Sequence, residues 1–407
     1  MAAADIQSLT SNPFVKLVAV ADVDLSRTKQ IREAHPDVRV YQDWRQLLEK
    51  EQGNIDSVNV STPDHLHGPI AHAAMQLGKH CYCQKPLAHN LHETRVLTEL
   101  AREKRLVTQM GIQIHSYKVY RQAAAIVQSG VIGKVKEVHT WSSKKWGDLG
   151  RPPERNDPVP ESLNWDLWLG PAPARPFHAT YFPGPRWYRW WDFANGTMSD
   201  LGSHDNDVPF TVLDLWRTDA AGGRALAPVS VEAVSPNVPV AHPELAPATL
   251  RATFLFAATG RQPALTLVWH QGDSRPPGWT PAWGRRSCVF MGDKGMLLGD
   301  GKLLPEEKFK DFRPPAPTLA PGARITVKDA GASGWITVQG EGKVGVHDVA
   351  TPTLIRFGQM TADELFISAT AAADGYEVVN TGPGPLVSLR YFGPDVHADL
   401  PKHGRKK

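Results

Sequence analysis

Between residues 15 and 113, short apolar runs alternate with segments whose apolar residues recur at helical spacing. The runs of strand length lie at 15–22, 38–42, 55–63, 80–85 and 105–113. The helical segments between them lie at 26–35, 44–52, 65–78 and 91–104. Gly78 stands where a glycine commonly ends a helix. Strands that alternate with amphipathic helices predict a parallel sheet covered on both faces.

The pattern changes after about residue 116. One helical segment at 118–130 leads into a long strand pattern at 133–147, and a loop-rich stretch follows. Further strands are predicted at 229–234, 250–258, 262–272 and 287–300. This order predicts a second domain of the α+β type, built on a large, mostly antiparallel sheet. The proline-rich residues 303–322 have the composition of a linker.

Composition narrows the class of protein. The chain has 407 residues and a net charge of +3, and 41% of its residues are hydrophobic. The only basic run is the terminal "KHGRKK", which argues against nucleic-acid binding. No apolar run has the length of a membrane span. Of the three cysteines, Cys81 and Cys83 share one face of a predicted strand, where we expect them to be small buried hydrophobes.

Tryptophan and proline are unusually frequent, with 13 and 34 copies. Many of them fall between residues 141 and 191. Such a stretch favours long ordered loops around a pocket over regular secondary structure.

Two polar groups follow strands of the predicted parallel sheet. Asp22 ends the strand at 15–22, where an acid can accept hydrogen bonds from an adenosine ribose and repel a 2′-phosphate. It is equally well explained as an ordinary turn acid, and Arg27 lies close by in the sequence. Ser61, Thr62 and Pro63 stand between a strand and a helix, where hydroxyls and helix amides suit a ribose and a phosphate. The plainer interpretation is a Thr-Pro turn with Asp64 as the helix cap.

A lysine and an acid–histidine pair complete the candidate chemistry. Lys85 ends a buried strand and precedes Pro86, a place where a lysine can shuttle protons. Asp200 and His204 are four residues apart, so on a helix they share one face and can form a base oriented by a carboxylate. A surface lysine and a polar helix face are the plainer alternatives. His65 and His67 point to different sides of a helix, and no metal site is expected.

Taken together and in this order, these motifs resemble the Gfo/Idh/MocA oxidoreductases, over roughly residues 2–321. The resemblance rests on "VAVADVD", "STPDHLH", "GKHCYCQKPLAHN", "TQMGIQ", "SGVIGKVKEVH", "NWDLWLGP" and "GTMSDLGSHDNDV". It is closest to the bacterial branch with "QKPL", and Gln84 stands where most members have glutamate. It implies a Rossmann domain over 1–115, a substrate domain over 116–322 and a divergent tail over 323–407.

The resemblance also implies an activity, a cofactor and a set of site residues. The chain would be an NAD-dependent dehydrogenase acting on a CH–OH group of a sugar, cyclitol or sugar derivative, with NAD as its cofactor. Lys85, Asp200 and His204 would be catalytic, with His204 the base. Cofactor contacts would come from Asp22, Ser61, Thr62, Pro63, His67, Gln84 and Gln113. Substrate contacts would come from Lys85, Arg189, Trp190 and His204.

In this family a strand and a glycine loop precede the helix predicted here at 2–11. We therefore expect that an upstream piece is absent, that NAD binds weakly to this chain, and that the strands at 15–22 and 55–60 lack a common neighbour. Two alternative functions stay open: a glycosidase-like enzyme that uses NAD transiently, and an inactive relative. A homodimer or homotetramer is expected. We expect a cytoplasmic location, or export if the upstream piece carried a signal.

Overall fold

The computed structural model describes residues 2–12, 15–147, 153, 155–213, 215, 227–235, 243–258, 262–283, 287–312, 322–328, 333–351, 364–384 and 386–392. The expected linker lies partly outside these residues. Its described part contains strand β12 (Leu303–Leu304) and the short helix η6 (Glu306–Phe309).

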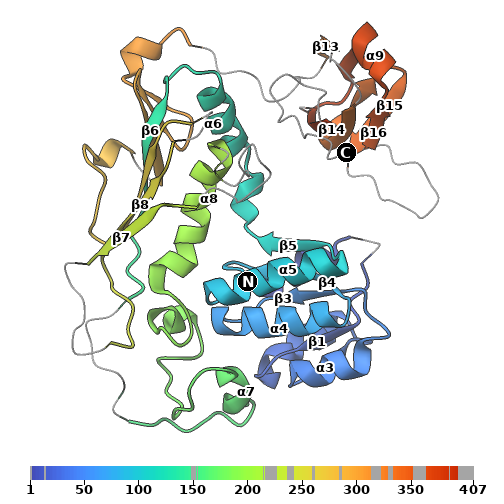
Figure 1. Cartoon of the computed structure of the whole chain (residues 1–407). Coiled ribbons are helices and arrows are strands. Elements are labelled where there is room, and N and C mark those ends of the chain that lie inside the picture. The colour runs from blue at the N-terminus through green and yellow to red at the C-terminus, as the bar shows by residue number, and fades with distance from the viewer. Residues whose placement is uncertain are drawn as a thin grey trace, which may run out of the picture.

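The N-terminal part alternates strands and helices, as the sequence predicts (Figure 1). Its strands are β1 (Ala19–Ala21), β2 (Arg39–Tyr41), β3 (Ser57–Val60), β4 (His80–Gln84) and β5 (Thr108–Gly111). Its helices are α1 (Ala2–Thr10), η1 (Leu25–Thr28), α2 (Lys29–Ala34), α3 (Trp44–Glu51), α4 (Asp64–Gln76) and α5 (Leu91–Lys104). All strand pairs here are parallel. The predicted Rossmann-type sheet is therefore confirmed in its direction and its order of elements.

These five strands form two separate sheets. One has the order β1-β2 and the other has the order β3-β4-β5. Among the described residues, β1 and β3 each have a strand on one side only. β1 is also shorter than the predicted strand 15–22, because only Ala19–Ala21 pair with β2. The prediction overestimated its length because an apolar run forms a strand only where a partner accepts its backbone hydrogen bonds.

The elements of this part begin and end as their residues dictate. Asn90 accepts a hydrogen bond from the backbone N–H of Glu93 and so caps α5. Gly78 adopts a positive φ of 75° just after α4, as a helix-ending glycine does. Cys81 and Cys83 are buried free thiols within the core of β3, β4, α4 and α5. Burial raises the pKa of Cys81 to about 11, so it behaves as an apolar side chain.

The second domain has a seven-stranded sheet in the order β12-β11-β10-β6-β9-β8-β7. Only β6 and β9 are parallel neighbours, so the mostly antiparallel sheet is confirmed. Its remaining strands are β6 (Val135–Ser142), β7 (Ser230–Val234), β8 (Leu250–Phe256), β9 (Leu265–Gln271), β10 (Cys288–Gly292) and β11 (Met296–Leu298). Helices α6 (Lys118–Gln128) and α8 (Ser203–Val212) lie beside this sheet (Figure 1). Ile126, Val208 and Phe290 are fully buried between helices and sheet.

The loop-rich stretch packs into an aromatic core of its own. It holds α7 (Trp165–Leu169) and the 3₁₀ turn η3 (Pro185–Arg189), and η5 (Pro281–Trp283) lies further along the chain. Trp168 packs against Phe193 with ring centroids 4.7 Å apart. His65 of α4 packs against the same two rings, and its Nε2 lies 2.9 Å from the Trp168 carbonyl oxygen. The stretch is therefore anchored onto the N-terminal domain.

The residues expected to form a divergent tail contain a small β unit. Its strands are β13 (Arg324–Val327), β14 (Ser333–Val344), β15 (His347–Thr351), β16 (Glu364–Ile367), β17 (Tyr376–Asn380) and β18 (Val387–Phe392), with one helix, α9 (Ala369–Asp374). Trp335, Val378 and Ala372 lie in its core. In the part of the chain that the structure describes, no helix is both long and apolar enough to cross a membrane.

Candidate active site

Lys85 lies at the carboxyl end of β4 and reaches across to the second domain. Its Nζ donates hydrogen bonds to the Asp200 carboxylate (2.8 Å) and to the Asp200 carbonyl oxygen (2.7 Å). The Tyr188 hydroxyl lies 3.4 Å from the same Nζ. Lys85 is only 3% exposed, so this is a buried ion pair between the two domains. The peptide bond from Lys85 to Pro86 is cis.

Asp200 accepts hydrogen bonds from three sides. Besides Lys85, the Lys144 Nζ lies 3.1 Å and the Trp146 Nε1 lies 2.5 Å from its Oδ2. Burial acts to raise the pKa of Asp200, but these donors outweigh it and hold the pKa below its ordinary range. Asp200 is therefore an ionised carboxylate at neutral pH.

His204 lies close to this cluster but is not hydrogen-bonded to Asp200 in any described contact. The two were expected on one face of a single helix. Instead Asp200 lies in η4 (Met198–Gly202), a π-helical turn, and His204 lies in α8. Its Nδ1 is buried without a hydrogen-bond partner among the described residues. Burial, together with Lys85 and Lys144, lowers the pKa of His204 to about 4, so the imidazole is neutral at neutral pH.

Two further residues near Lys85 were not predicted as part of the site, although Asp64 was expected to cap a helix. Asp64 begins α4, where Pro63 is the N-cap, and its side chain is almost completely buried. Burial raises its pKa to about 8, so its carboxyl is largely protonated at neutral pH. Tyr188 packs on Trp187 with ring centroids 3.9 Å apart. The neighbouring Arg189 and Trp190 were expected substrate contacts, but Tyr188 was not.

A second polar cluster lies at the carboxyl ends of β3 and β4. Ser61 Oγ donates to the Asp5 carboxylate of α1 at 2.5 Å, and Gln84 Nε2 donates to both Asp5 oxygens at 2.9 Å. Gly111 leaves room for this arrangement, because a Cβ there would come within 2.6 Å of Gln84 Oε1. Ser61 and Gln84 thus lie together, as the cofactor assignment requires. Asp5 is an additional carboxylate that the sequence did not reveal.

Other cofactor candidates lie at the edges of the same sheets. Asp22 follows β1 and accepts a hydrogen bond from the Asp24 backbone N–H at 2.9 Å. Burial raises its pKa from the ordinary value. Thr62 Oγ1 donates to the Pro63 carbonyl oxygen at 3.3 Å. Gln113 is exposed and begins η2 (Gln113–Ser116), just after β5.

Two of the predicted contact residues are buried among other side chains and backbone. His67 is completely buried, with Nδ1 2.6 Å from the Pro86 carbonyl oxygen and Nε2 2.9 Å from the Thr62 carbonyl oxygen. Both ring nitrogens therefore face backbone carbonyl oxygens. Trp190 is 3% exposed and packs edge-on against Tyr181, so it belongs to the aromatic core. Arg189 beside it is half-buried.

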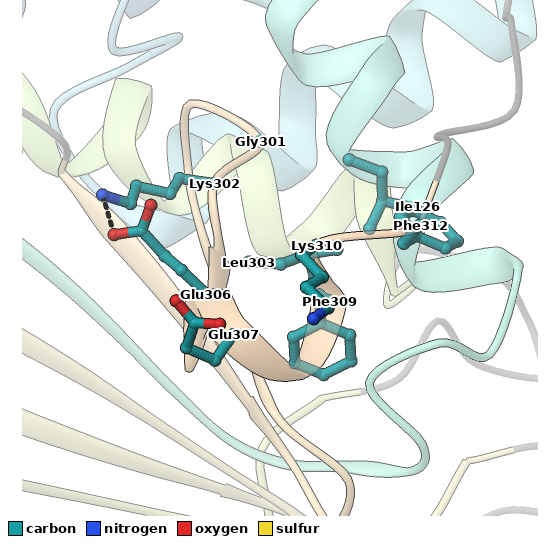
Figure 2. Close-up of a pocket in the computed structure, with 9 residues that line it drawn as sticks. All are labelled: Ile126, Gly301, Lys302, Leu303, Glu306, Glu307, Phe309, Lys310 and Phe312. Atoms are coloured by element: carbon teal, nitrogen blue, oxygen red, sulfur yellow. Dashed lines mark ion pairs between the residues drawn. The ribbon is translucent and has the colours of Figure 1, made fainter.

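A surface hollow of about 410 Å³ lies elsewhere, between α6 and the chain around β12 (Figure 2). Its lining includes Ile126, Phe309 and an ion pair between Lys302 and Glu306. None of its lining residues belongs to the Lys85–Asp200 cluster. In the described residues, no group of three or more His, Cys, Asp or Glu side chains could hold a metal ion.

Two family models match the chain over both of these domains. Residues 1–112 match the model described as oxidoreductase family, NAD-binding Rossmann fold. Residues 118–237 match the model for the C-terminal alpha/beta domain of the same family. The chain belongs to the Gfo/Idh/MocA oxidoreductase family. The resemblance drawn from its motifs is thereby confirmed, and NAD is the cofactor of the family's Rossmann domain.

Similar proteins within this family include two named dehydrogenases. Levoglucosan dehydrogenase of Pseudarthrobacter phenanthrenivorans is 28% identical over 123 residues, which is 30% of this chain. The scyllo-inositol 2-dehydrogenase (NAD(+)) of Bacillus subtilis is 30% identical over 126 residues, or 31% of this chain. The aligned segments span only 30% and 36% of these two relatives.

Among solved structures, the WlbA dehydrogenase of Bordetella pertussis, in complex with NADH and UDP-GlcNAcA, has a similar fold. Its TM-score is 0.51 at 15% identity, with 74% of this chain and 78% of that chain covered. At this identity the likeness concerns the fold alone. It confirms the combination of a Rossmann-type sheet with a large, mostly antiparallel sheet.

Proposed function

We propose that this protein is an NAD-dependent dehydrogenase that oxidises a CH–OH group of a sugar, cyclitol or sugar derivative. The observation that carries the proposal is the cluster at the carboxyl end of β4. There, Lys85 forms a buried ion pair with Asp200 of the second domain. A neutral His204, whose Nδ1 has no hydrogen-bond partner among the described residues, lies close by. The names of the relatives, a levoglucosan dehydrogenase and an inositol dehydrogenase, support this class of substrate.

The residues of the sheet edge fit NAD in part. Ser61 and Gln84 offer a hydroxyl and an amide where ribose hydroxyls need partners, and Asp22 stands where an adenosine ribose is recognised in this kind of sheet. Asp5 fits a bound NAD less well. Its carboxylate accepts the hydrogen bonds of both Ser61 and Gln84, and its negative charge repels the phosphates of the cofactor. Asp5 must therefore move aside when the cofactor binds.

Ser61, Gln84 and Asp22 would hold NAD, which would supply the hydride acceptor for the carbon that carries the hydroxyl. His204 takes the hydroxyl proton on its imidazole, a role that requires the neutral ring maintained by burial and by the two lysines. Lys85 holds a positive charge beside the hydroxyl oxygen, where negative charge develops. Asp200 fixes the Lys85 ammonium in place, and Tyr188 lines it from the other side.

Replacing Lys85 tests this assignment. Lys85→Met keeps the length of the side chain and removes its charge. We expect the maximal rate to fall by about 10²–10⁴-fold, while NAD affinity stays nearly unchanged. Retention of most of the rate in a folded Lys85→Met protein would remove Lys85 from the mechanism. Removing one partner of a buried ion pair costs about 3–5 kcal/mol, so folding must be checked first by thermal unfolding.

The assembly state is a separate part of the proposal. Val229, Val231, Val234 and Leu255 are exposed apolar side chains on or next to β7 and β8, at one edge of the large sheet. Such side chains favour association of copies through this edge. We expect a homodimer or homotetramer, and sedimentation equilibrium measures its mass directly.

A further inference from the structure

Lys144 is a second lysine at the Asp200 carboxylate, and the proposed mechanism uses it only to help keep His204 neutral. It lies two residues beyond the end of β6. Its backbone N–H donates to Ser142 Oγ at 3.2 Å, and Thr197 Oγ1 lies 3.4 Å from its carbonyl oxygen. The start of this loop is therefore fixed, and the Lys144 side chain is directed to Asp200.

Asp200 is already satisfied without Lys144. Lys85 pairs with its Oδ1, and the Trp146 indole N–H donates to its Oδ2. One buried cation is enough to compensate one buried carboxylate. The Lys144 side chain is 50% exposed, whereas that of Lys85 is 4% exposed. The Lys144 ammonium therefore keeps donors that face away from Asp200 and can reach a ligand.

The charges of Lys85, Lys144, Asp200, His204 and Asp64 sum to an excess of one positive charge. Lys85 and Lys144 are cations and Asp200 is an anion. His204 and Asp64 are largely uncharged at neutral pH, because burial lowers the pKa of the first to about 4 and raises that of the second to about 8. Lys144 lies near enough to His204 to contribute to the lowering of its pKa. A neutral ligand would leave this excess charge uncompensated.

We propose that Lys144 binds an anionic group of the substrate, and that the substrate is therefore an acidic sugar carrying a carboxylate or a phosphoryl group. This inference rests on the proposed function, whose substrate class it narrows. The Trp146 ring stacks on Tyr188 with centroids 6.0 Å apart, and the Lys144 Nζ lies 5.2 Å from the centroid of the same ring, so a sugar held by Lys144 would pack beside this aromatic pair. The anionic group of the substrate would accept a charge-assisted hydrogen bond from the Lys144 ammonium, in addition to the contacts that the sugar ring makes.

Binding measurements on the full 407-residue chain test this without any turnover. Calorimetric titrations would compare D-glucuronate, D-glucose 6-phosphate and neutral D-glucose. We expect at least one acidic sugar to bind about tenfold or more tightly than glucose, as one charge-assisted hydrogen bond allows. The tighter of the two acidic sugars then identifies the group as carboxylate or phosphoryl.

Variants connect the preference to Lys144. Lys144→Met should abolish the preference for the acidic sugar, and Lys144→Arg should retain it. Lys145→Met is the matched control, because Lys145 pairs with Asp273 on the surface and its loss changes the net charge equally. Equal binding of glucose, absence of binding by both acidic sugars, or an unchanged preference in Lys144→Met overturns the proposal. Because no step needs NAD, failure to form NADH would count against the proposed function and not against this site.

Discussion

The protonation states of His204 and Asp64 decide what the cluster around Lys85 can do at neutral pH. His204 is uncharged and can accept a proton, whereas Asp64 retains its proton and adds no second negative charge. Burial lowers the pKa of His204 and raises that of Asp64, so both are uncharged. Asp200 is then the ionised acid of this cluster, and it lies between two lysines. Such a division of roles by environment is typical of sites for acid–base chemistry.

Asp5 gives a prediction about the cofactor. Its carboxylate occupies Ser61 and Gln84, and a negative charge there opposes a phosphate-bearing ligand. Asp5→Asn keeps the shape and removes the charge. We expect NAD to bind about tenfold more tightly, because juxtaposed like charges are costly. Calorimetry measures the affinity, and Asp37→Asn, an exposed acid at the amino end of β2, is the control. Unchanged or weaker binding in Asp5→Asn would contradict this role.

Asp22 gives a prediction about the choice between NAD and NADP. We expect Asp22→Ser to raise the ratio of kcat/KM for NADP over NAD by about tenfold, because it removes a charge that repels a 2′-phosphate. Steady-state kinetics with both cofactors measures this ratio. If wild type already uses NADP as well as NAD, Asp22 does not select the cofactor, and Arg27 becomes the residue to test.

Sequence patterns revealed some residues of the site and not others. Lys85 stood out because it ends a predicted strand, and Asp200 and His204 stood out because they are four residues apart. Tyr188 and Asp64 could not be assigned, because their roles depend on contacts between segments more than 100 residues apart. The doubled lysine of "WSSKKWG" was the one available signal for Lys144, yet only the structure separates Lys144 from Lys145.

At the scale of elements, the helices were predicted well because their periodicity is local. The helix predicted at 91–104 is α5 with the same bounds, and its cap residue Asn90 lies just before it. Strand lengths were less predictable, because a strand ends where its partner ends. β1 shows this, since three residues pair out of a predicted run of eight. The small β unit of β13 to β18 was missed because several of its strands pair with partners that are distant in the sequence, as β13 does with β17 and β14 with β18.

Unequal pairing of strands gives a prediction for amide hydrogen exchange. β4 is paired on both sides, by β3 and β5, whereas β1 pairs with β2 alone among the described strands. Backbone groups with fewer partners open more readily. We expect the amides of Ala19–Ala21 to exchange at least about tenfold faster than those of His80–Gln84. Mass spectrometry of peptides from the intact chain measures both, and equal protection of the two strands would contradict the separation of the sheets.

At the scale of the whole molecule, buried ionisable groups set the pH dependence of stability. Burial lowers the pKa of five histidines below the ordinary value of 6.5, namely His65, His67, His139, His204 and His270. Between about pH 6.5 and 4 the unfolded chain therefore binds more protons at these histidines, so they make stability fall as the pH falls.

Three acids act in the opposite direction. Burial raises the pKa of Asp64 to about 8, that of Asp205 to about 7 and that of Asp22 above its ordinary value, so their contribution to stability falls as the pH rises from about 4. Five histidines outweigh three acids below pH 6.5, and the acids act above it. We expect the melting temperature to be highest near pH 6.5, and scanning calorimetry across pH 4–8 measures it. A melting temperature that rises steadily from pH 6.5 to 4 would contradict this balance.

The central claim is that the cluster of Lys85, Asp200 and His204 oxidises a hydroxyl-bearing carbon with NAD. The most direct measurement is the amount of NADH formed per molecule of oxidised sugar, for the wild type, for His204→Asn and for the control Lys145→Met. The account predicts one NADH per product molecule, a rate about 10²–10⁴-fold lower in His204→Asn, and no change in the control. Product formed without net NADH, or an unchanged rate in His204→Asn, would contradict it.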